Sequence, residues 1–278
     1  MSIVLVTDSA ADLPKEFAKK HMIEVVPLSI QIGDEHFIDG VTIDTKLFYE
    51  KMAYSEKLPQ TSLPSPQAFI DSFQKIGPDK EILCITISAA TSGTYQSAII
   101  AKTSLPNYKI EVIDSLSISM GTGLLVMRAQ ELINKGLSFS EIRDDLLDYR
   151  HTINIFIAID KLDNVIKGGR ISNWQGALAN LLNIKPILNI FPDGSLNVVD
   201  KIRGRKRQLK RVLELFEKTN KDLTNSKFVI LHAKAPKDEI VFLENKIREL
   251  FNPQEIIIGE LGPVMGTHGG FGSIGFAY

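Results

Sequence analysis

Three short polar loops contain the residues whose types and spacing favour ligand binding. Thr7-Asp8-Ser9, residues 88–94 and Asp114-Ser115 each follow an apolar run and precede a helical pattern. In an open parallel sheet, ligands bind beyond the carboxyl ends of the strands. A hydroxyl group there, beside the free N–H groups at a helix N-terminus, favours an anion. The loops therefore predict an anion-binding edge.

The second of these loops, residues 88–94, is called the hydroxyl loop below. In it, Gly93 lets the backbone approach a ligand closely, and Ser92 can donate its hydroxyl group to a carboxylate. The alternative is that the Ser and Asp residues of such loops only cap helices. For Ser92 both interpretations stay open, whereas capping is favoured for Asp12, Ser65 and Ser138.

A glycine-rich run, residues 262–275, surrounds a single histidine near the C-terminus. Its glycines, with Gly266-Thr267-His268 at the centre, suggest backbone held close to a ligand and His268 as a hydrogen-bond donor. The alternative is a tight loop with an exposed histidine.

Cations concentrate in residues 201–211, where seven of eleven side chains are basic. Such a run can bind phosphate, nucleic acid or an acidic partner, or it can form a solvated helix face. Nucleic acid is disfavoured, because no aromatic residues interleave with the cations and the whole chain has a net charge of −1. Arg170, in Lys167-Gly168-Gly169-Arg170, is a separate candidate for holding an anion.

The elements that position these residues alternate between strands and helices in the first half. Strands are predicted at residues 3–6, 25–32, 81–87 and 109–113. Helices are predicted from Asp12 and Pro14 to Lys20, from Ser65-Pro66 to Gly77, and onward from a capping box formed by Ser138 and Glu141. This alternation predicts a parallel-sheet α/β domain over residues 1–150.

The second half has a different rhythm and predicts a second α/β domain, residues 151–278, with a mixed sheet. Strands are predicted at residues 154–159, 185–191, 227–233 and 255–258, and a hairpin turn at Pro192-Asp193-Gly194-Ser195. An apolar helix is predicted through Leu178 and Leu181, and a basic helix over residues 204–218.

Composition narrows the class of protein. The 278 residues are 44% hydrophobic and 23% charged, as in ordinary globular proteins. The N-terminus has no signal-peptide pattern, and no apolar stretch is long enough to predict membrane insertion. The single cysteine, Cys84, suits a reducing cytoplasm, and the five histidines lack the spacing of metal ligands. Neither a phosphate-binding loop, a dinucleotide fingerprint nor a nucleophile elbow is present.

Taken together, the motifs resemble those of the DegV family of fatty-acid-binding proteins. They occur in family order over almost the whole chain: Thr7-Asp8-Ser9-Ala10-Ala11-Asp12-Leu13-Pro14, Thr61-Ser62-x-Pro64-Ser65, Ser92-Gly93-Thr94-Tyr95-Gln96-Ser97-Ala98, Gly168-Gly169-Arg170-Ile171-Ser172, Asn183-Ile184-Lys185-Pro186-Ile187-Leu188, Lys201-x-Arg203-Gly204-x-Lys206 and Gly266-Thr267-His268. Their ordered combination is specific, although no single motif is.

The resemblance implies a cytoplasmic, non-enzymatic carrier with no cofactor, which encloses one long-chain fatty acid between its two α/β domains. It implies that Thr61, Ser92 and His268 hold the carboxylate, with Ser62, Gly93, Gly266 and Thr267 around it. Arg170 and Arg203 would serve the phosphorylated head group or the contact with a separate ATP-dependent fatty acid kinase, whose product, a bound acyl phosphate, would feed phospholipid synthesis.

Two alternatives remain open. One is a stand-alone hydrolase or phosphotransferase that uses Ser92, His268 and Asp8, which must then lie within hydrogen-bond reach of one another. The other is a lipid sensor that binds a fatty acid without serving a kinase.

Overall fold

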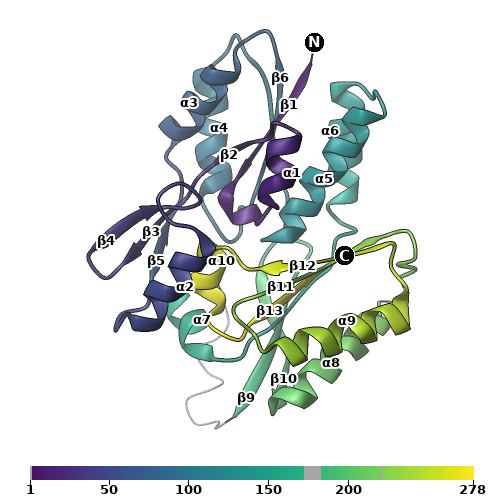
Figure 1. Cartoon of the computed structure of the whole chain (residues 1–278). Coiled ribbons are helices and arrows are strands. Elements are labelled where there is room, and N and C mark those ends of the chain that lie inside the picture. Colours follow the sequence, from purple (N-terminus) through teal and green to yellow (C-terminus); the bar gives the residue numbers. More distant parts are fainter. Residues whose placement is uncertain (1, 172–182, 220) are drawn as a thin grey trace. The chain divides into compact units, whose positions relative to one another are not determined.

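A computed structural model describes residues 2–171, 183–219 and 221–278 (Figure 1). The apolar helix predicted through Leu178 and Leu181 lies outside the described residues, as does Ser172. The chain divides into two compact units. The first comprises Met1–Ile153 with Pro192–Ser195 and Gly262–Met265, and the second comprises Asn154–Phe191, Leu196–Leu261 and Gly266–Tyr278.

A four-stranded parallel sheet forms the centre of the first unit, in the order β2-β1-β6-β7. The strands are β1 (Ile3–Asp8), β2 (Glu24–Val26), β6 (Glu81–Thr86) and β7 (Lys109–Asp114). The fold class predicted from strand–helix alternation is confirmed.

Helices cover both faces of this sheet, because neighbouring strand residues point to opposite sides. Leu5 and Leu83 pack with α5 (Met120–Asn134) and α6 (Phe139–Tyr149). Val6 and Cys84 face the other side, against α3 (Pro66–Ile76) and α4 (Thr94–Ser104). Cys84 is therefore a core residue.

The helix-start predictions in this unit are mostly confirmed. Ser65 caps α3 by accepting a hydrogen bond from the Ala68 N–H, and Ser138 and Glu141 form the predicted capping box of α6. Asp12 is the exception. It ends a short 3₁₀ helix, Ser9–Ala11, with a left-handed backbone, while α1 (Lys15–Lys20) begins after Pro14.

A smaller antiparallel sheet completes the first unit, in the order β4-β3-β5. The single strand predicted over residues 25–32 is wrong, because the chain leaves β2 at Pro27, which has no N–H to donate to a ladder, and starts β3 (Ser29–Ile32) in the other sheet. The additional strands are β4 (Glu35–Ile38) and β5 (Gln60–Ser62), and α2 (Thr45–Tyr54) lies between them in the sequence.

The second unit contains a six-stranded mixed sheet, in the order β10-β9-β8-β13-β11-β12. Its strands are β8 (Ile155–Ala158), β9 (Ile184–Ile190), β10 (Leu196–Arg203), β11 (Lys227–His232), β12 (Glu255–Glu260) and β13 (Ile274–Ala277). β9 and β10 form the predicted antiparallel hairpin, and β11 and β12 are parallel.

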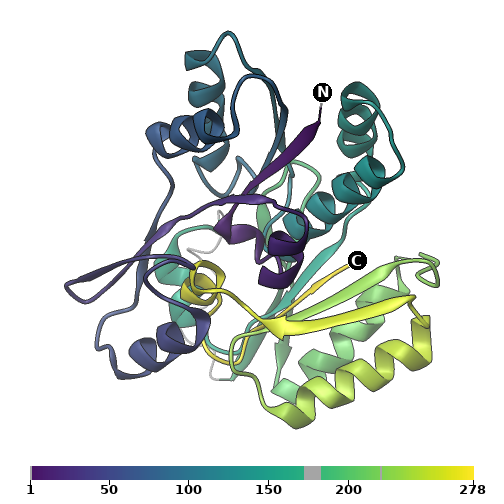
Figure 2. The same cartoon turned by 45° about the horizontal axis from the view of Figure 1, so that its top comes forward.

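Two long helices, α8 (Arg205–Glu217) and α9 (Lys237–Phe251), run side by side along this sheet (Figure 2). They share one core with it, centred on Phe216, whose ring meets Phe156, Phe228 and Phe276 edge to face. The basic stretch lies largely on α8, which buries Leu209 and Val212 on its opposite side. A solvated amphipathic face therefore accounts for much of that charge.

Two short helices position the residues of the candidate site in this half of the chain. α7 (Leu162–Gly168) ends at Gly169, which has a positive φ of 66°. α10 (Pro263–Gly269) occupies the first part of the glycine-rich run, where no regular element was predicted.

Candidate functional site

The polar loops at the carboxyl edge of the parallel sheet mostly hold their own backbone. Asp8 is fully buried and accepts hydrogen bonds from the N–H groups of Ala10 (3.0 Å) and Ile87 (2.8 Å). Asp114 accepts from the N–H groups of Ala89 (3.2 Å) and Leu116 (2.9 Å). These two carboxylates cap the backbone of their own loops. Fewer side chains at this edge of the sheet are therefore candidates for binding an anion than the sequence predicts.

Ser88, at the start of the hydroxyl loop, also has a structural partner. Its side chain is fully buried, and its hydroxyl group donates to the Gly194 carbonyl oxygen at 2.9 Å. A Cβ on Gly194 would lie 2.2 Å from the Ser88 Oγ, so only glycine fits there. Ser88 thus anchors the Pro192–Ser195 turn, which belongs to the first unit.

Ser92 is held differently, by its own loop. Its Oγ lies 2.8 Å from the Thr94 Oγ1 and accepts a hydrogen bond from the Thr94 N–H at 3.3 Å. Ser92 is only half-buried, while Thr94 is fully buried. When the Thr94 hydroxyl group is the donor, both acceptor positions of Ser92 are filled and its own hydrogen is left to donate outward.

Thr61 and Ser62 lie on β5, close to this loop. A Cβ on Gly93 would lie 3.0 Å from Leu63 Cδ2, so the end of β5 meets the start of α4 there. Thr61 is half-buried and pairs with Ile30 of β3, while Ser62 is exposed. As consecutive strand residues, Thr61 and Ser62 point to opposite faces. Of the two, Thr61 is the more buried. The approach of Leu63 to Gly93 shows that the first unit brings the segments of Thr61 and Ser92 together.

His268 lies in the last turn of α10, and the alternative of an exposed loop histidine is wrong. A Cβ on Gly168 would lie 2.6 Å from the His268 Nδ1, so glycine is required for α7 to approach the ring. Burial, helped by the positive charge of Arg170, lowers the pKa of His268 to about 4. The imidazole is therefore neutral near pH 7 and can offer one N–H donor.

The rest of the glycine-rich run is packed tightly by the second unit itself. Gly270 and Gly272 have positive φ angles of 72° and 81°, and a Cβ on Gly270 would lie 2.7 Å from the Asn164 Oδ1. Asn164 donates to the Thr267 carbonyl oxygen at 2.9 Å, and the Gly266 carbonyl oxygen accepts from the Gly270 N–H at 2.9 Å. Gly266 and Thr267 therefore shape the backbone around His268.

The two candidate arginines of the second unit lie far apart. Arg170 donates to the Gly168 carbonyl oxygen at 2.6 Å, and the next residue, Ile171, bridges to Leu196 at the start of β10. Arg203 is the last residue of β10. At about 3.3 Å per strand residue, the two ends of β10 are separated by roughly 20 Å. Arg170 shares the neighbourhood of His268, whereas Arg203 belongs to another part of this unit.

Several supporting residues were not recognised in the sequence. Gly168 and Asn164 hold His268 and its helix, and Asp12 was interpreted as a helix cap. Burial raises the pKa of Asp12 to about 7 and that of Asp39 to about 6. Asp12 accepts a hydrogen bond from the distant Gly262 N–H. The sequence marks Gly262-Pro263 as a turn, but a turn signal does not show that Asp12 lies beside it.

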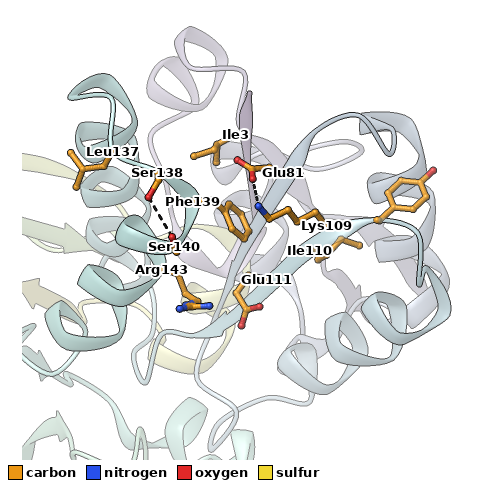
Figure 3. Close-up of a pocket in the computed structure, with 11 residues that line it drawn as sticks. Ile3, Glu81, Lys109, Ile110, Glu111, Leu137, Ser138, Phe139, Ser140 and Arg143 are labelled. Atoms are coloured by element: carbon orange, nitrogen blue, oxygen red, sulfur yellow. Dashed lines mark hydrogen bonds and ion pairs between the residues drawn. The ribbon is translucent and has the colours of Figure 1, made fainter. Parts of the chain in front are cut away.

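A pocket of about 610 Å³ opens at the opposite, amino edge of the parallel sheet (Figure 3). Ile3, Glu81 and Lys109, which begin β1, β6 and β7, line it. Figure 3 shows Lys109 directed at Glu81, its ion-pair partner, beside the ring of Phe139. None of the predicted site residues lines this pocket.

Within residues 2–171, 183–219 and 221–278, no group of three or more His, Cys, Asp or Glu side chains is arranged to hold a metal ion. Over the same residues, no helix is long and apolar enough to cross a membrane.

The family model described as an uncharacterised protein family, DegV, matches residues 2–278. The chain belongs to the DegV family. A DegV domain-containing protein of Clostridium acetobutylicum is 38% identical over 272 residues, which cover 96% of this chain and 95% of the relative. Another, from Halalkalibacterium halodurans, is 34% identical and covers 99% of this chain and 98% of the relative.

Solved DegV structures share the whole fold and carry ligand information. A fatty-acid-binding DegV protein of Thermus thermophilus has a TM-score of 0.91 and 29% identity, and the match covers 100% of this chain and 99% of that one. The fatty acid kinase B3 protein of Streptococcus pneumoniae, loaded with linoleic acid, has a TM-score of 0.88 and 27% identity, with the same coverage. This DegV protein is thus similar over its full length to proteins that bind fatty acids.

Proposed function

We propose that this protein binds one long-chain fatty acid and holds its carboxylate with Thr61 and Ser92 of the first unit and His268 of the second. The observation that carries the proposal is the arrangement at Ser92, whose Oγ accepts from the Thr94 N–H and lies 2.8 Å from the Thr94 Oγ1. With the Thr94 hydroxyl group as the donor of that pair, the Ser92 hydrogen can donate to a ligand. Ser62, Gly93, Gly266 and Thr267 complete the surroundings. The fatty acids bound by similar DegV proteins support this choice of ligand.

Energetics favour a donor site of this kind for a lipid carrier. Burying an acyl chain of about sixteen carbons gains about 12 kcal/mol before ordering costs, at roughly 0.8 kcal/mol per methylene group. A carboxylate buried without partners would forfeit much of that gain, so the head group requires hydrogen-bond donors. Two hydroxyl groups and a neutral imidazole offset this cost without a permanent charge.

We further propose that the protein is a cytoplasmic carrier without an activity or cofactor of its own, which presents the carboxylate to a separate ATP-dependent fatty acid kinase. The absence of a phosphate-binding loop from the sequence fits this division of labour. Arg170, beside His268, is assigned to the phosphorylated head group. Arg203, at the other end of β10, is assigned to the kinase contact. The expected product is a bound acyl phosphate for phospholipid synthesis.

The stand-alone enzyme is the weaker candidate. Both carboxylate oxygens of Asp8 accept backbone N–H groups within the first unit. Asp8 is therefore occupied as a loop cap, which argues against its use to orient a histidine for nucleophilic catalysis.

The first test is native mass spectrometry of the freshly purified protein, followed by extraction and identification of any lipid. The expected result is one fatty acid per chain. A protein that is purified without lipid and fails to load added oleate or palmitate would contradict the proposal.

Site variants test the head-group assignment. Ser92→Ala and Thr61→Ala are each expected to weaken oleate affinity by about tenfold, because each removes a hydrogen bond to a charged group. Thr103→Ala, which removes an exposed hydroxyl group at the other end of α4, is the control and should bind normally. Unchanged affinity in both site variants would contradict the assignment.

The kinase role has its own test. Arg203→Ala should retain oleate affinity but lower acyl phosphate formation by an added fatty acid kinase, while Lys218→Ala, an exposed cation at the end of α8 and outside the family motif, serves as the control. Tight oleate binding without acyl phosphate formation by the wild-type protein would favour the lipid-sensor alternative.

A further inference from the structure

Asp12 makes a long-range connection that helix capping does not explain. Its Oδ1 accepts a hydrogen bond from the Gly262 N–H at 3.0 Å, and its Oδ2 accepts one from the Ser119 hydroxyl group at 2.5 Å. Gly262 lies 250 residues away in the sequence, yet with Pro263–Met265 it belongs to the same compact unit as Asp12. One carboxylate thus joins three distant segments of the first unit.

The local backbone is adapted to this junction. Asp12 and Ser119 have φ angles of 50° and 51°, which are unfavourable for residues other than glycine. A Cβ on Gly262 would lie 2.4 Å from the Asp12 Oδ1, so only glycine can bring its N–H to the carboxylate. Strained conformations persist where surrounding interactions require them.

The residue after Gly262 is Pro263, which begins α10. The same helix carries Gly266, Thr267 and His268 toward its end. Because a helix is continuous and hydrogen-bonded, a shift or rotation of its first turn is transmitted to residues one turn later. The carboxylate of Asp12 therefore fixes the start of the helix that ends with the histidine of the proposed site.

We infer that Asp12 is a positioning residue for His268, acting through its hydrogen bond to Gly262 and the rigidity of α10. This inference deepens the proposed function and rests on it for the role of His268. The placement of His268 against Gly168 should then depend on a side chain from the other end of the sequence.

The ionisation of His268 reports on the connection without any ligand. In the wild-type protein the pKa of His268 is lowered to about 4 by its burial. Asp12→Ala should release the start of α10, let the ring become more exposed and raise that pKa by about one unit or more. NMR titration of the imidazole carbon-bound protons measures this, and the missing signal in His268→Gln assigns the resonance.

Three further variants make the test specific. Asp12→Asn keeps an oxygen that accepts from Gly262, so it should restore a low His268 pKa and near-normal oleate affinity, while Asp12→Ala weakens affinity by about tenfold. Asp44→Ala removes another carboxylate cap of the first unit, at α2, and should leave His268 unchanged. If Asp12→Ala does not fold, Gly262→Ala replaces it, because its new Cβ would lie 2.4 Å from the Asp12 Oδ1 and displace the carboxylate from the Gly262 N–H.

An unchanged pKa of His268 in the folded Asp12→Ala protein, or in Gly262→Ala when that variant is needed, would overturn the inference. So would equal shifts in Asp44→Ala, because they would reflect general loosening. The titration uses the ligand-free protein, so it decides the positioning role even when the wild-type protein fails to bind oleate. Such a failure would contradict the proposed function alone.

Discussion

The hydroxyl loop and the glycine-rich run each carry a residue of the proposed head-group site, but they hold it in different ways. Ser92 is held by hydrogen bonds with Thr94, the second residue after it, and its side chain is half-buried. His268 is held by close backbone packing, with Gly168 against its ring. Hydrogen bonds within a loop leave a side chain adjustable, whereas glycine packing leaves no spare volume.

The largest expected effect comes from adding one methyl group beside His268, with the same addition in the hydroxyl loop as the comparison. Gly168→Ala places a Cβ 2.6 Å from the His268 Nδ1, so either the imidazole ring must leave its position or α7 must shift. It should lower the free energy of unfolding by about 1–3 kcal/mol and weaken oleate affinity.

Gly93→Ala is the matched control in the hydroxyl loop. There the new Cβ meets Leu63 Cδ2 at 3.0 Å, and the exposed leucine side chain can rotate away. We expect a change within about 0.5 kcal/mol. Urea denaturation of both variants measures the difference, and equal losses of stability would contradict the distinction between the two regions.

A somewhat smaller effect separates two serines within the hydroxyl loop. Ser88→Ala leaves the buried Gly194 carbonyl oxygen without its donor and should cost about 1–2 kcal/mol of stability, with little direct effect on oleate binding. Ser92→Ala should instead weaken oleate binding and have little effect on stability. The same denaturation and binding measurements apply, and parallel losses in both properties for both variants would contradict separate roles.

A graded effect of pH should have opposite signs in the two units. His268, with its pKa lowered by burial, adds stability that is present above pH 6.5 and lost as the pH falls toward 4. Asp12, with its pKa raised to about 7 by burial near Asp8 and Asp39, adds stability that is present below pH 3.8 and lost as the pH rises through 7.

Unfolding free energies measured between pH 4 and 8 test both signs. The difference between the wild-type protein and His268→Gln should grow as the pH rises toward 6.5. The difference from Asp12→Asn should shrink as the pH rises toward 7. Two difference curves with the same slope would show that burial does not act on these groups as described.

The smallest effect is expected outside both regions. Lys109→Ala breaks a surface ion pair with Glu81 at the amino-edge pocket and should change stability by at most about 1 kcal/mol. Oleate affinity should stay unchanged, because none of the proposed head-group residues lines that pocket. A marked loss of affinity would move the proposed site to this edge of the sheet.

Much of the secondary structure could be predicted because its signals are local. Ser65 with Pro66 marks the start of α3, and Pro192-Asp193-Gly194-Ser195 marks the β9–β10 hairpin. The errors have local causes as well. The ladder could not continue past Pro27, and the glycines of residues 262–275 hid α10 and β13, since glycine is a poor helix and strand former.

By itself, the sequence determined the family, the parallel and mixed sheets, and the candidate residues Thr61, Ser92 and His268. Only the tertiary structure decided which polar groups already have partners. Ser88 and Ser92 are the same residue type in one loop, yet Ser88 donates to the carbonyl oxygen of Gly194, 106 residues away, whereas Ser92 is hydrogen-bonded to its neighbour Thr94. The sequence predicts that Asp12 caps a helix, whereas in the structure its carboxylate accepts a hydrogen bond from the Gly262 N–H. Local preferences depend on neighbouring residues, whereas the partners of a buried polar group depend on how distant segments pack.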